Sequence, residues 1–250
     1  MLNRLCLAFQ FLTLLPTPHC QYREQDFAKA AYFYPLVGTV IGLALYGFAL
    51  ILPFATTALN SALLFGLWLL ITGGLHWDGL ADMTDAWVGG GQDKDKTLAI
   101  MKDPTAGPMA ILVIVAISAI MLASIYTILQ STQGIFWFWL TPVIARTTLL
   151  LQLKLTPYAK PQGYGSSIKQ QLKVPLILLQ VSFFVGLSVL MTTPMIMISW
   201  VIAGGVVIWI HFNCKKRIQG LTGDVIGASI VLQECAILVC MALLLNHLKP

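Results

Sequence analysis

Seven apolar stretches, each close to the length of a membrane-spanning helix, constrain what this chain can fold into. A spanning helix needs about 20 mostly apolar residues. The stretches cover residues 33–52, 59–75, 108–130, 135–153, 174–191, 195–213 and 225–246. We therefore predict an all-α fold: a polytopic integral membrane bundle of about seven transmembrane helices.

The scarcity of charge supports a membrane protein. Only 10% of the 250 residues are charged, against roughly 25% in soluble domains, so charged side chains cannot cover a water-soluble surface. No internal repeat or long linker divides the chain, which predicts one membrane-embedded domain over residues 1–250. The net charge of +5 is interpreted as a membrane-orientation signal, with no nucleic-acid partner.

The first twenty residues resemble a signal peptide, but they lack a small-residue cleavage site. Their apolar run, at about eleven residues, is too short to span a bilayer. We predict a short N-terminal helix that lies in the membrane interface or packs beside the bundle.

Lys and Arg occur in alternate connections between the apolar stretches. They occupy the N-terminal segment and residues 76–107, 154–173 and 214–224, whereas residues 53–58, 131–134 and 192–194 contain none. Because basic loops of membrane proteins stay in the cytoplasm, the pattern predicts the N-terminus inside and the C-terminus outside. Every acidic residue except Glu234 falls in an inside segment, so the sequence predicts a site that faces the cytoplasm.

Three acidic residues form the strongest candidate site. Asp78, Asp82 and Asp85 are spaced i, i+4 and i+7, which places them on one face of a helix. Like charges so close destabilise a bare helix, and carboxylate oxygens are ligands that Mg²⁺ or Mn²⁺ prefers. The pattern predicts a metal site, and the alternative is a solvated polar helix.

Other ionisable residues near this segment have two interpretations each. His76 precedes the acids and is either a structural hydrogen bonder or a direct participant. Lys102 and Asp103 stand just before the turns that lead back into the membrane. Lys102 can bind phosphate as a point charge and Asp103 can bind metal or orient water, unless both only anchor the loop at the interface.

Arg146 is the one Lys or Arg residue inside the apolar stretches, and Glu234 is the one Asp or Glu residue there; buried charge in a membrane is costly and usually functional. Arg146 either contacts a phosphate or pairs with Glu234. Asp224 stands in the predicted first turn of the last helix. It either complements the helix dipole or adds a carboxylate to the metal site.

Five sequence motifs resemble the cobalamin synthase family, the adenosylcobinamide-GDP ribazoletransferases, along nearly the whole chain. They are RLCLAFQFLTLLPTP at the start, YPLVGTVIG at 34–42, GGLHWDGLADMTDAW at 73–87, MKDPTAGPMA at 101–110, and GLTGDVIGA with QE within 220–234. Trp77 and Trp87 depart from the aliphatic residues expected there. Neither change removes a carboxylate.

The resemblance implies the last assembly step of coenzyme B12, with Mg²⁺ as cofactor. In that step α-ribazole, or its 5′-phosphate, attacks the phosphate on the cobinamide arm of adenosylcobinamide-GDP and GMP leaves. It also implies a multi-pass protein of the bacterial cytoplasmic (inner) membrane. The expected partners are these substrates and the lipid bilayer, with a homo-oligomer or other corrinoid-pathway enzymes as open possibilities.

The resemblance also carries residue roles by motif position. It implies metal ligands at Asp78, Asp82 and Asp85, with Asp85 as an alternative general base. Lys102 and Arg146 would neutralise phosphates. We expect further cofactor or substrate contacts from His76, Asp103 and Asp224.

Two other classes of protein stay open at this point. A phosphotransferase that uses CDP-linked donors also places several Asp residues on one helix, but Asp82 stands where its characteristic Arg would be. A secondary transporter predicts inverted repeats and acids near the midplane. Neither feature is present in this sequence.

Overall fold

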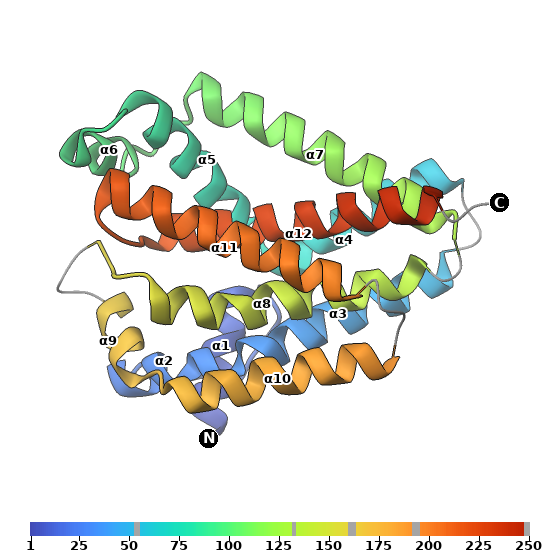
Figure 1. Ribbon diagram of the computed structural model, residues 1–250, viewed down its shortest axis with the longest axis horizontal. Coiled ribbons are helices and arrows are strands. Elements are labelled where there is room, and N and C mark those ends of the chain that lie inside the picture. The colour runs from blue at the N-terminus through green and yellow to red at the C-terminus, as the bar shows by residue number, and fades with distance from the viewer. Residues whose placement is uncertain (53–55, 132–133, 160–163, 192–195, 248–250) are drawn as a thin grey trace.

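The computed structural model describes residues 1–52, 56–131, 134–159, 164–191 and 196–247, and these residues form helices without a β-strand. Figure 1 shows most of the long helices side by side along the long axis of the molecule, with α5 inclined to them at the end that carries α6. The short ones are α1 (Leu2–Leu12), α2 (Glu24–Ala30), η1 (Ala31–Phe33), α6 (Lys94–Ile100), η2 (Gly134–Phe136) and α9 (Tyr164–Gln171). The long ones are α3 (Tyr34–Ile51), α4 (Thr57–Thr72), α5 (Leu75–Gly89), α7 (Pro108–Leu129), α8 (Trp137–Leu155), α10 (Val174–Met191), α11 (Ile196–Ile218) and α12 (Gly223–His247).

Each of the seven apolar stretches corresponds to a helix, but fewer than seven reach spanning length. Within the described ranges five helical segments are long and apolar enough to cross a membrane, and the bent pair α4–α5 makes a possible sixth. The shorter α10 does not qualify. The all-α polytopic fold is confirmed, and the described residues contain five or six candidate spans, compared with about seven predicted.

A glycine pair breaks the second apolar stretch. Gly73 and Gly74 both have positive φ, at 65° and 66°, a conformation that L side chains adopt only at a cost. Consequently α4 ends at Thr72 and α5 starts at an angle of 88° to it. The N–H of Leu14 donates to the carbonyl of Ile71 at 2.8 Å, so the N-terminal segment satisfies part of the exposed end of α4.

Helix α8 lies at the centre of the bundle and is the most buried of the candidate spans. Helix α3 packs along it through Gly38 and Gly42, which form a GxxxG motif. A Cβ atom at either glycine would clash with the backbone at Pro142 or Trp139. Small residues at this spacing let two membrane helices approach closely.

The predicted short N-terminal helix is confirmed as α1, which packs on α2 and α3. Leu12 and Ala8 are fully buried there, and Arg4 pairs with Asp26 of α2 at 2.7 Å. These contacts agree with a helix beside the bundle. Its depth in the bilayer stays a prediction.

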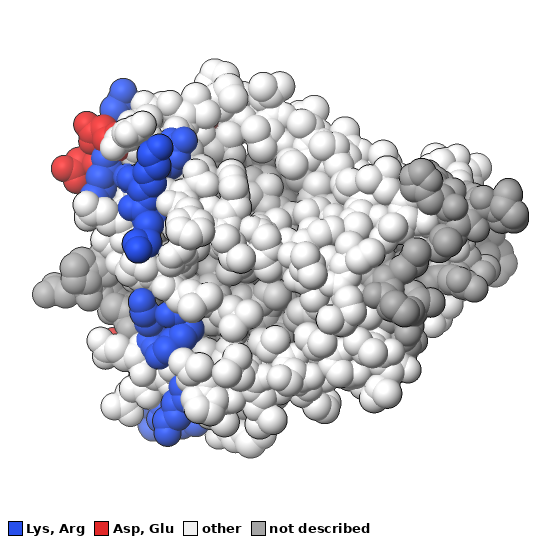
Figure 2. Space-filling view, viewed as in Figure 1, with Lys and Arg blue, Asp and Glu red and all other residues white. Residues whose placement is uncertain are grey.

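Helix α5, which is not one of the five spanning segments, lies against α12. A Cβ on Gly79 would come within 2.5 Å of the Asp224 carbonyl, and one on Gly227 within 3.2 Å of the His76 Cα. The two glycines therefore allow the acidic helix to sit directly on the start of α12. On the face in Figure 2, charged side chains gather at the end of the bundle that carries α6 and α9 in Figure 1.

Candidate active site

Three cavities meet at the N-terminus of α12, and Gly223 lines all of them. The acidic cavity, of about 390 Å³, has Asp78, Asp224 and His76 in its wall. The lysine cavity, of about 180 Å³, is lined by Leu98, Met101, Lys102, Tyr158, Leu221, Thr222, Gly223 and Asp224. The aromatic cavity, of about 230 Å³, is lined by Phe11, Phe27, Tyr34, Leu153, Tyr158, Ile168, Gly223 and Ile226.

Carboxylates from two helices face the acidic cavity. Asp78 is exposed on the first turn of α5, and Asp224 lies in the first turn of α12. Partial burial, followed by the negative charges of three neighbouring carboxylates, raises the pKa of Asp82 to about 6. Those neighbours are, in order of effect, Asp78, Asp224 and Asp85. The folded chain thus adds Asp224 to the acidic group that the α5 spacing predicted.

His76 lines the same cavity and is 6% exposed. Its Nε2 atom has no hydrogen-bond partner within the described part of the chain. The prediction of a contact from His76 therefore has support from its position, although its role is untested.

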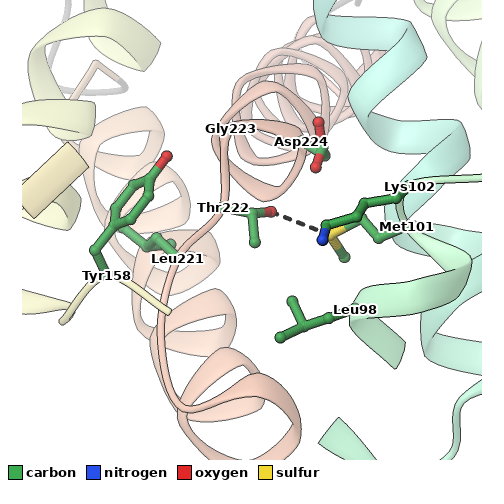
Figure 3. A pocket seen from close by; sticks show the side chains of 8 residues that line it. All are labelled: Leu98, Met101, Lys102, Tyr158, Leu221, Thr222, Gly223 and Asp224. Atoms are coloured by element: carbon green, nitrogen blue, oxygen red, sulfur yellow. Dashed lines mark hydrogen bonds between the residues drawn. The ribbon is translucent and has the colours of Figure 1, made fainter. Parts of the chain in front are cut away.

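The lysine cavity brings Lys102 opposite Tyr158, with Thr222 between them and Asp224 on the same side as Lys102 (Figure 3). Tyr158 is held there because the segment after α8 pairs with the segment before α12. The N–H of Leu221 donates to the Pro157 carbonyl at 2.8 Å, and the N–H of Ala159 donates to the Leu221 carbonyl at 2.9 Å. Burial and the Asp224 charge raise the pKa of Tyr158. Lys102 therefore lies on this cavity beside Asp224, and its phosphate contact stays a prediction.

Asp85 has a structural partner that the spacing did not predict. Its carboxylate accepts the N–H groups of Gly107 at 2.5 Å and Ala110 at 2.9 Å, at the start of α7. Unpaired N–H groups at a helix N-terminus are strong sites for a carboxylate. Asp85 therefore caps α7 from a different helix. Both of its oxygens are engaged, which leaves it poorly placed to act as a base.

The carboxylates do not form a three-ligand metal cage. Among the residues that the structure describes, no group of three or more His, Cys, Asp or Glu side chains is close enough to hold a metal ion. Capping by Asp85 accounts for part of this, because it turns one acid of the α5 face toward α7. Mg²⁺ commonly uses only one or two carboxylates and completes its shell with water and substrate phosphates. The Asp78 and Asp224 pair on the acidic cavity fits that donor set.

Asp103 lies outside the lysine cavity, unlike its neighbour Lys102. Its Oδ1 accepts hydrogen bonds from the N–H of Thr105 at 2.9 Å and from the Thr105 hydroxyl at 2.6 Å. These bonds hold the pKa of the exposed Asp103 carboxyl below its usual range. Asp103 shapes the loop before α7, and the predicted cofactor contact has no geometric support.

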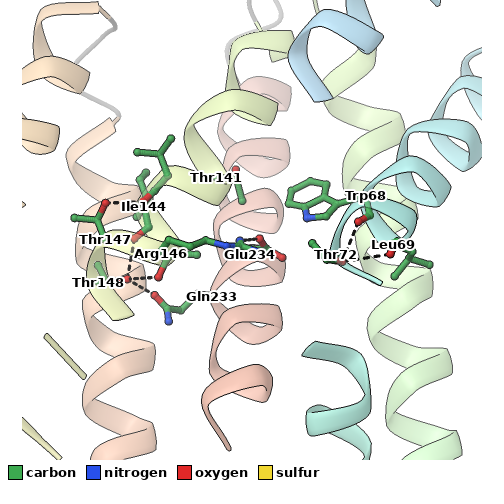
Figure 4. Close-up of polar contacts among 12 residues, drawn as sticks. Trp68, Leu69, Thr72, Thr141, Ile144, Arg146, Thr147, Thr148, Gln233 and Glu234 are labelled. Atoms are coloured by element: carbon green, nitrogen blue, oxygen red, sulfur yellow. Dashed lines mark hydrogen bonds and ion pairs between the residues drawn. The ribbon is translucent and has the colours of Figure 1, made fainter. Parts of the chain in front are cut away.

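The alternative interpretation of Arg146 is the one that the structure shows. Arg146 pairs with Glu234 inside the bundle, and both side chains are buried, as Figure 4 shows. A second set of polar contacts follows on the same two helices, where Thr148 donates to Gln233 and Gln233 donates to Ser229. The Arg146 charge is thus balanced within the protein. Its role toward phosphate stays a prediction.

Arg217 is a residue of the site region that sequence reasoning missed. Its NH1 donates to the carbonyls of Trp87 and Gly91, both at 2.8 Å, and its guanidinium lies 5.3 Å from the Trp87 ring centroid. A cation at the C-terminal end of a helix complements the helix dipole. Arg217 therefore anchors the end of α5 to α11, and it gives a reason for the unexpected Trp87. Only the basic run at 215–217 hinted at it.

The fold and the cleft together define a class: a polytopic helical membrane protein with carboxylates and a lysine converging at the charged end of its bundle. The model of the family described as "Cobalamin-5-phosphate synthase" matches residues 4–242. The chain belongs to that family.

Curated relatives agree over almost the full length. A protein from Pseudomonas aeruginosa named "Adenosylcobinamide-GDP ribazoletransferase" is 40% identical, covering 97% of this chain and 98% of its own. Proteins of the same name from Ectopseudomonas mendocina and Stutzerimonas stutzeri are each 37% identical; they cover 95% and 96% of this chain and 97% of their own lengths. No solved structure shows a significant match.

Proposed function

We propose that this chain transfers the cobinamide-phosphate group of adenosylcobinamide-GDP to α-ribazole or its 5′-phosphate. The family assignment names the reaction. The single structural observation that carries the proposal is the convergence of Asp78, Asp224 and Lys102 on adjoining cavities at the start of α12. Carboxylates and a cation at one cleft are suited to phosphoryl transfer, which depends mainly on positioning and charge neutralisation.

The reaction needs one new bond and one broken bond at phosphorus. A free hydroxyl oxygen of the acceptor ribose bonds to the phosphorus attached to cobinamide; it is not the 5′ oxygen, because that position carries the phosphate in one of the two acceptors. The bond from that phosphorus to the bridging oxygen breaks, and GMP leaves with the electron pair. With either acceptor the hydroxyl proton is released, and it passes to a carboxylate of the acidic group formed by Asp78, Asp82, Asp85 and Asp224. Because Asp85 is engaged at α7, we assign that proton to Asp82.

We assign the neutralisation of phosphate charge to Lys102, whose side chain reaches into the lysine cavity. Asp78 and Asp224, which line the acidic cavity, would hold Mg²⁺. When bound there, Mg²⁺ supplies charge neutralisation for the departing GMP. His76 lines the same cavity and, with its Nε2 atom unpartnered within the described residues, would contact the bound groups there.

We propose further that the charged end faces the cytoplasm of a bacterium whose inner membrane holds the bundle. Two observations support this orientation: the alternation of basic connections along the chain, and the collection of charge at one end of the visible surface (Figure 2). Both water-soluble substrates would then reach the cleft from the cytoplasmic side.

The test is an assay of the full chain, purified and reconstituted in liposomes, with adenosylcobinamide-GDP and α-ribazole. We expect GMP and a cobalamin to form in equal amounts, with loss of both after EDTA and recovery with Mg²⁺. Asp78→Asn should abolish turnover, whereas Asp95→Asn, an exposed acid on α6, should not. No cobalamin with both substrates and metal present would refute the assignment, and turnover of CDP-linked donors would then favour the CDP-alcohol class.

A further inference from the structure

The aromatic cavity has a wall unlike those of its two neighbours. Phe11 stacks on Tyr34 with ring centroids 5.8 Å apart, and it meets Phe27 edge-to-face at 5.4 Å. Leu153, Ile168 and Ile226 complete an apolar lining, and among the described residues that line it only Tyr34 and Tyr158 contribute side-chain polar atoms. Flat, apolar walls of this kind favour a flat, apolar ligand.

One polar atom in this wall lacks a partner. Tyr34 is 1% exposed, and its hydroxyl has no hydrogen-bond partner within the described residues. Burying a hydroxyl without a partner is costly. Tyr34 and Tyr158 both line this cavity. The lining therefore offers a ligand one unsatisfied hydroxyl in an apolar surrounding.

The cavity also opens beside the reacting groups. Gly223 belongs to its wall and to the walls of both other cavities, and Tyr158 is shared with the lysine cavity. A ligand whose base fills the aromatic cavity would extend its sugar past Gly223 toward Asp224 and Lys102. The exposed backbone of Gly223, which has open space at its Cβ position, leaves room for that connection.

We propose that the aromatic cavity binds the planar base of the acceptor nucleoside, a fused bicyclic ring with a single free ring nitrogen that accepts a hydrogen bond from the Tyr34 hydroxyl. This inference rests on the proposed function and adds to it the place of the acceptor. A benzimidazole nucleoside has that chemistry, since its other nitrogen carries the sugar. Guanine does not fit, because its edge carries several donors and acceptors that this lining would leave unpaired.

The experiment compares two acceptor bases that differ at one atom. Binding of a benzimidazole nucleoside and of the matching indole nucleoside, in which a C–H replaces the ring nitrogen, is measured by calorimetry on the full chain in detergent. We expect Tyr34→Phe to weaken binding of the benzimidazole nucleoside roughly tenfold and to leave binding of the indole nucleoside unchanged. Phe27→Leu should weaken both equally, because it removes ring contact. Tyr126→Phe, at an exposed tyrosine of α7, is the matched control and should change neither.

Steady-state kinetics of the same variants provide the second readout. Tyr34→Phe should raise the KM of the acceptor and leave that of adenosylcobinamide-GDP unchanged. A raised KM for the donor alone would overturn the proposal, because it would place guanine in the cavity. Equal weakening of the two nucleosides by Tyr34→Phe would also overturn it, because the Tyr34 hydroxyl would then make no hydrogen bond to the ring nitrogen. If no cobalamin formed while Tyr34→Phe still selectively weakened the benzimidazole nucleoside, the proposed reaction would fail and the base site would stand.

Discussion

The carboxylate of Asp85 on α5 accepts the backbone N–H of Gly107, 22 positions along the chain, at the entrance to α7. The same carboxylate accepts the N–H of Ala110. One acid of an apparently catalytic face is thus a cap for a neighbouring spanning helix. A loss of function on substitution of Asp85 therefore has two explanations, loss of the cap of α7 or loss of a catalytic base.

Asp85→Ala should lower the free energy of unfolding by about 1–2 kcal/mol, because α7 loses a capping carboxylate. Asp85→Asn keeps one acceptor oxygen and should lose less. Both are measured by denaturant titration in mixed micelles, with Asp95→Ala as a control at an exposed acid. Unchanged stability in Asp85→Asn together with a loss of kcat would instead identify Asp85 as the base.

Gly79→Ala should separate the acidic helix from α12, because the new methyl group would meet the Asp224 carbonyl and Cα. Overpacking of this kind costs about 1–3 kcal/mol, and the shift of Asp224 should reduce turnover at least tenfold. Gly66→Ala on α4, where open space surrounds the Cβ position, should retain activity. Equal activity of the two variants would show that the α5–α12 approach is not needed for the reaction.

Lys102 and Asp103 are neighbours with different surroundings: Lys102 lines the lysine cavity, and Asp103 bonds to Thr105. Lys102→Ala should lower kcat/KM for adenosylcobinamide-GDP about a hundredfold, as expected for loss of a charge-assisted phosphate contact. Asp103→Asn should change it less than about threefold, because the exposed carboxyl serves a loop turn with Thr105. Initial-rate kinetics at varied donor concentration measure both. A larger loss at Asp103 would restore its predicted cofactor contact.

Arg217→Ala should loosen the C-terminal end of α5, where the guanidinium holds two carbonyls. Activity should fall about tenfold, and hydrogen exchange at the end of α5 should increase, while Lys216→Ala at the exposed neighbour should change neither. Arg217→Lys should recover only part of the effect, because lysine lacks the planar donor fork. Faster exchange without loss of activity would limit Arg217 to stability.

The buried pair allows a test of structure against catalysis. Arg146→Met alone should cost about 3–5 kcal/mol, because Glu234 would be left as an uncompensated buried charge. The double variant Arg146→Met, Glu234→Met should recover most of that loss. Unfolding in mixed micelles measures the stability of each. A stable double variant without turnover would support the predicted phosphate role of Arg146, whereas a stable and active one would confirm a purely structural pair.

Much of this protein follows from local sequence. The apolar stretches determined the all-α membrane class because a backbone in lipid must satisfy its hydrogen bonds within a helix. The i, i+4, i+7 spacing likewise predicted a common face for Asp78, Asp82 and Asp85. Both properties depend on neighbours within about two helical turns, so they can be inferred without a fold.

The tertiary structure decided which of those residues share a cavity. The break at Gly73–Gly74 and the close contact of Gly79 with the Asp224 backbone placed α5 against α12, and this contact brought Asp224 to the acidic residues of α5. Asp85 was diverted to the start of α7, and Arg146 was matched with Glu234, 88 residues away. Tyr34 and Tyr158 came to one cavity from α3 and from the loop after α8. Contacts between distant residues depend on how helices cross, and helix periodicity alone carries no information about the crossing.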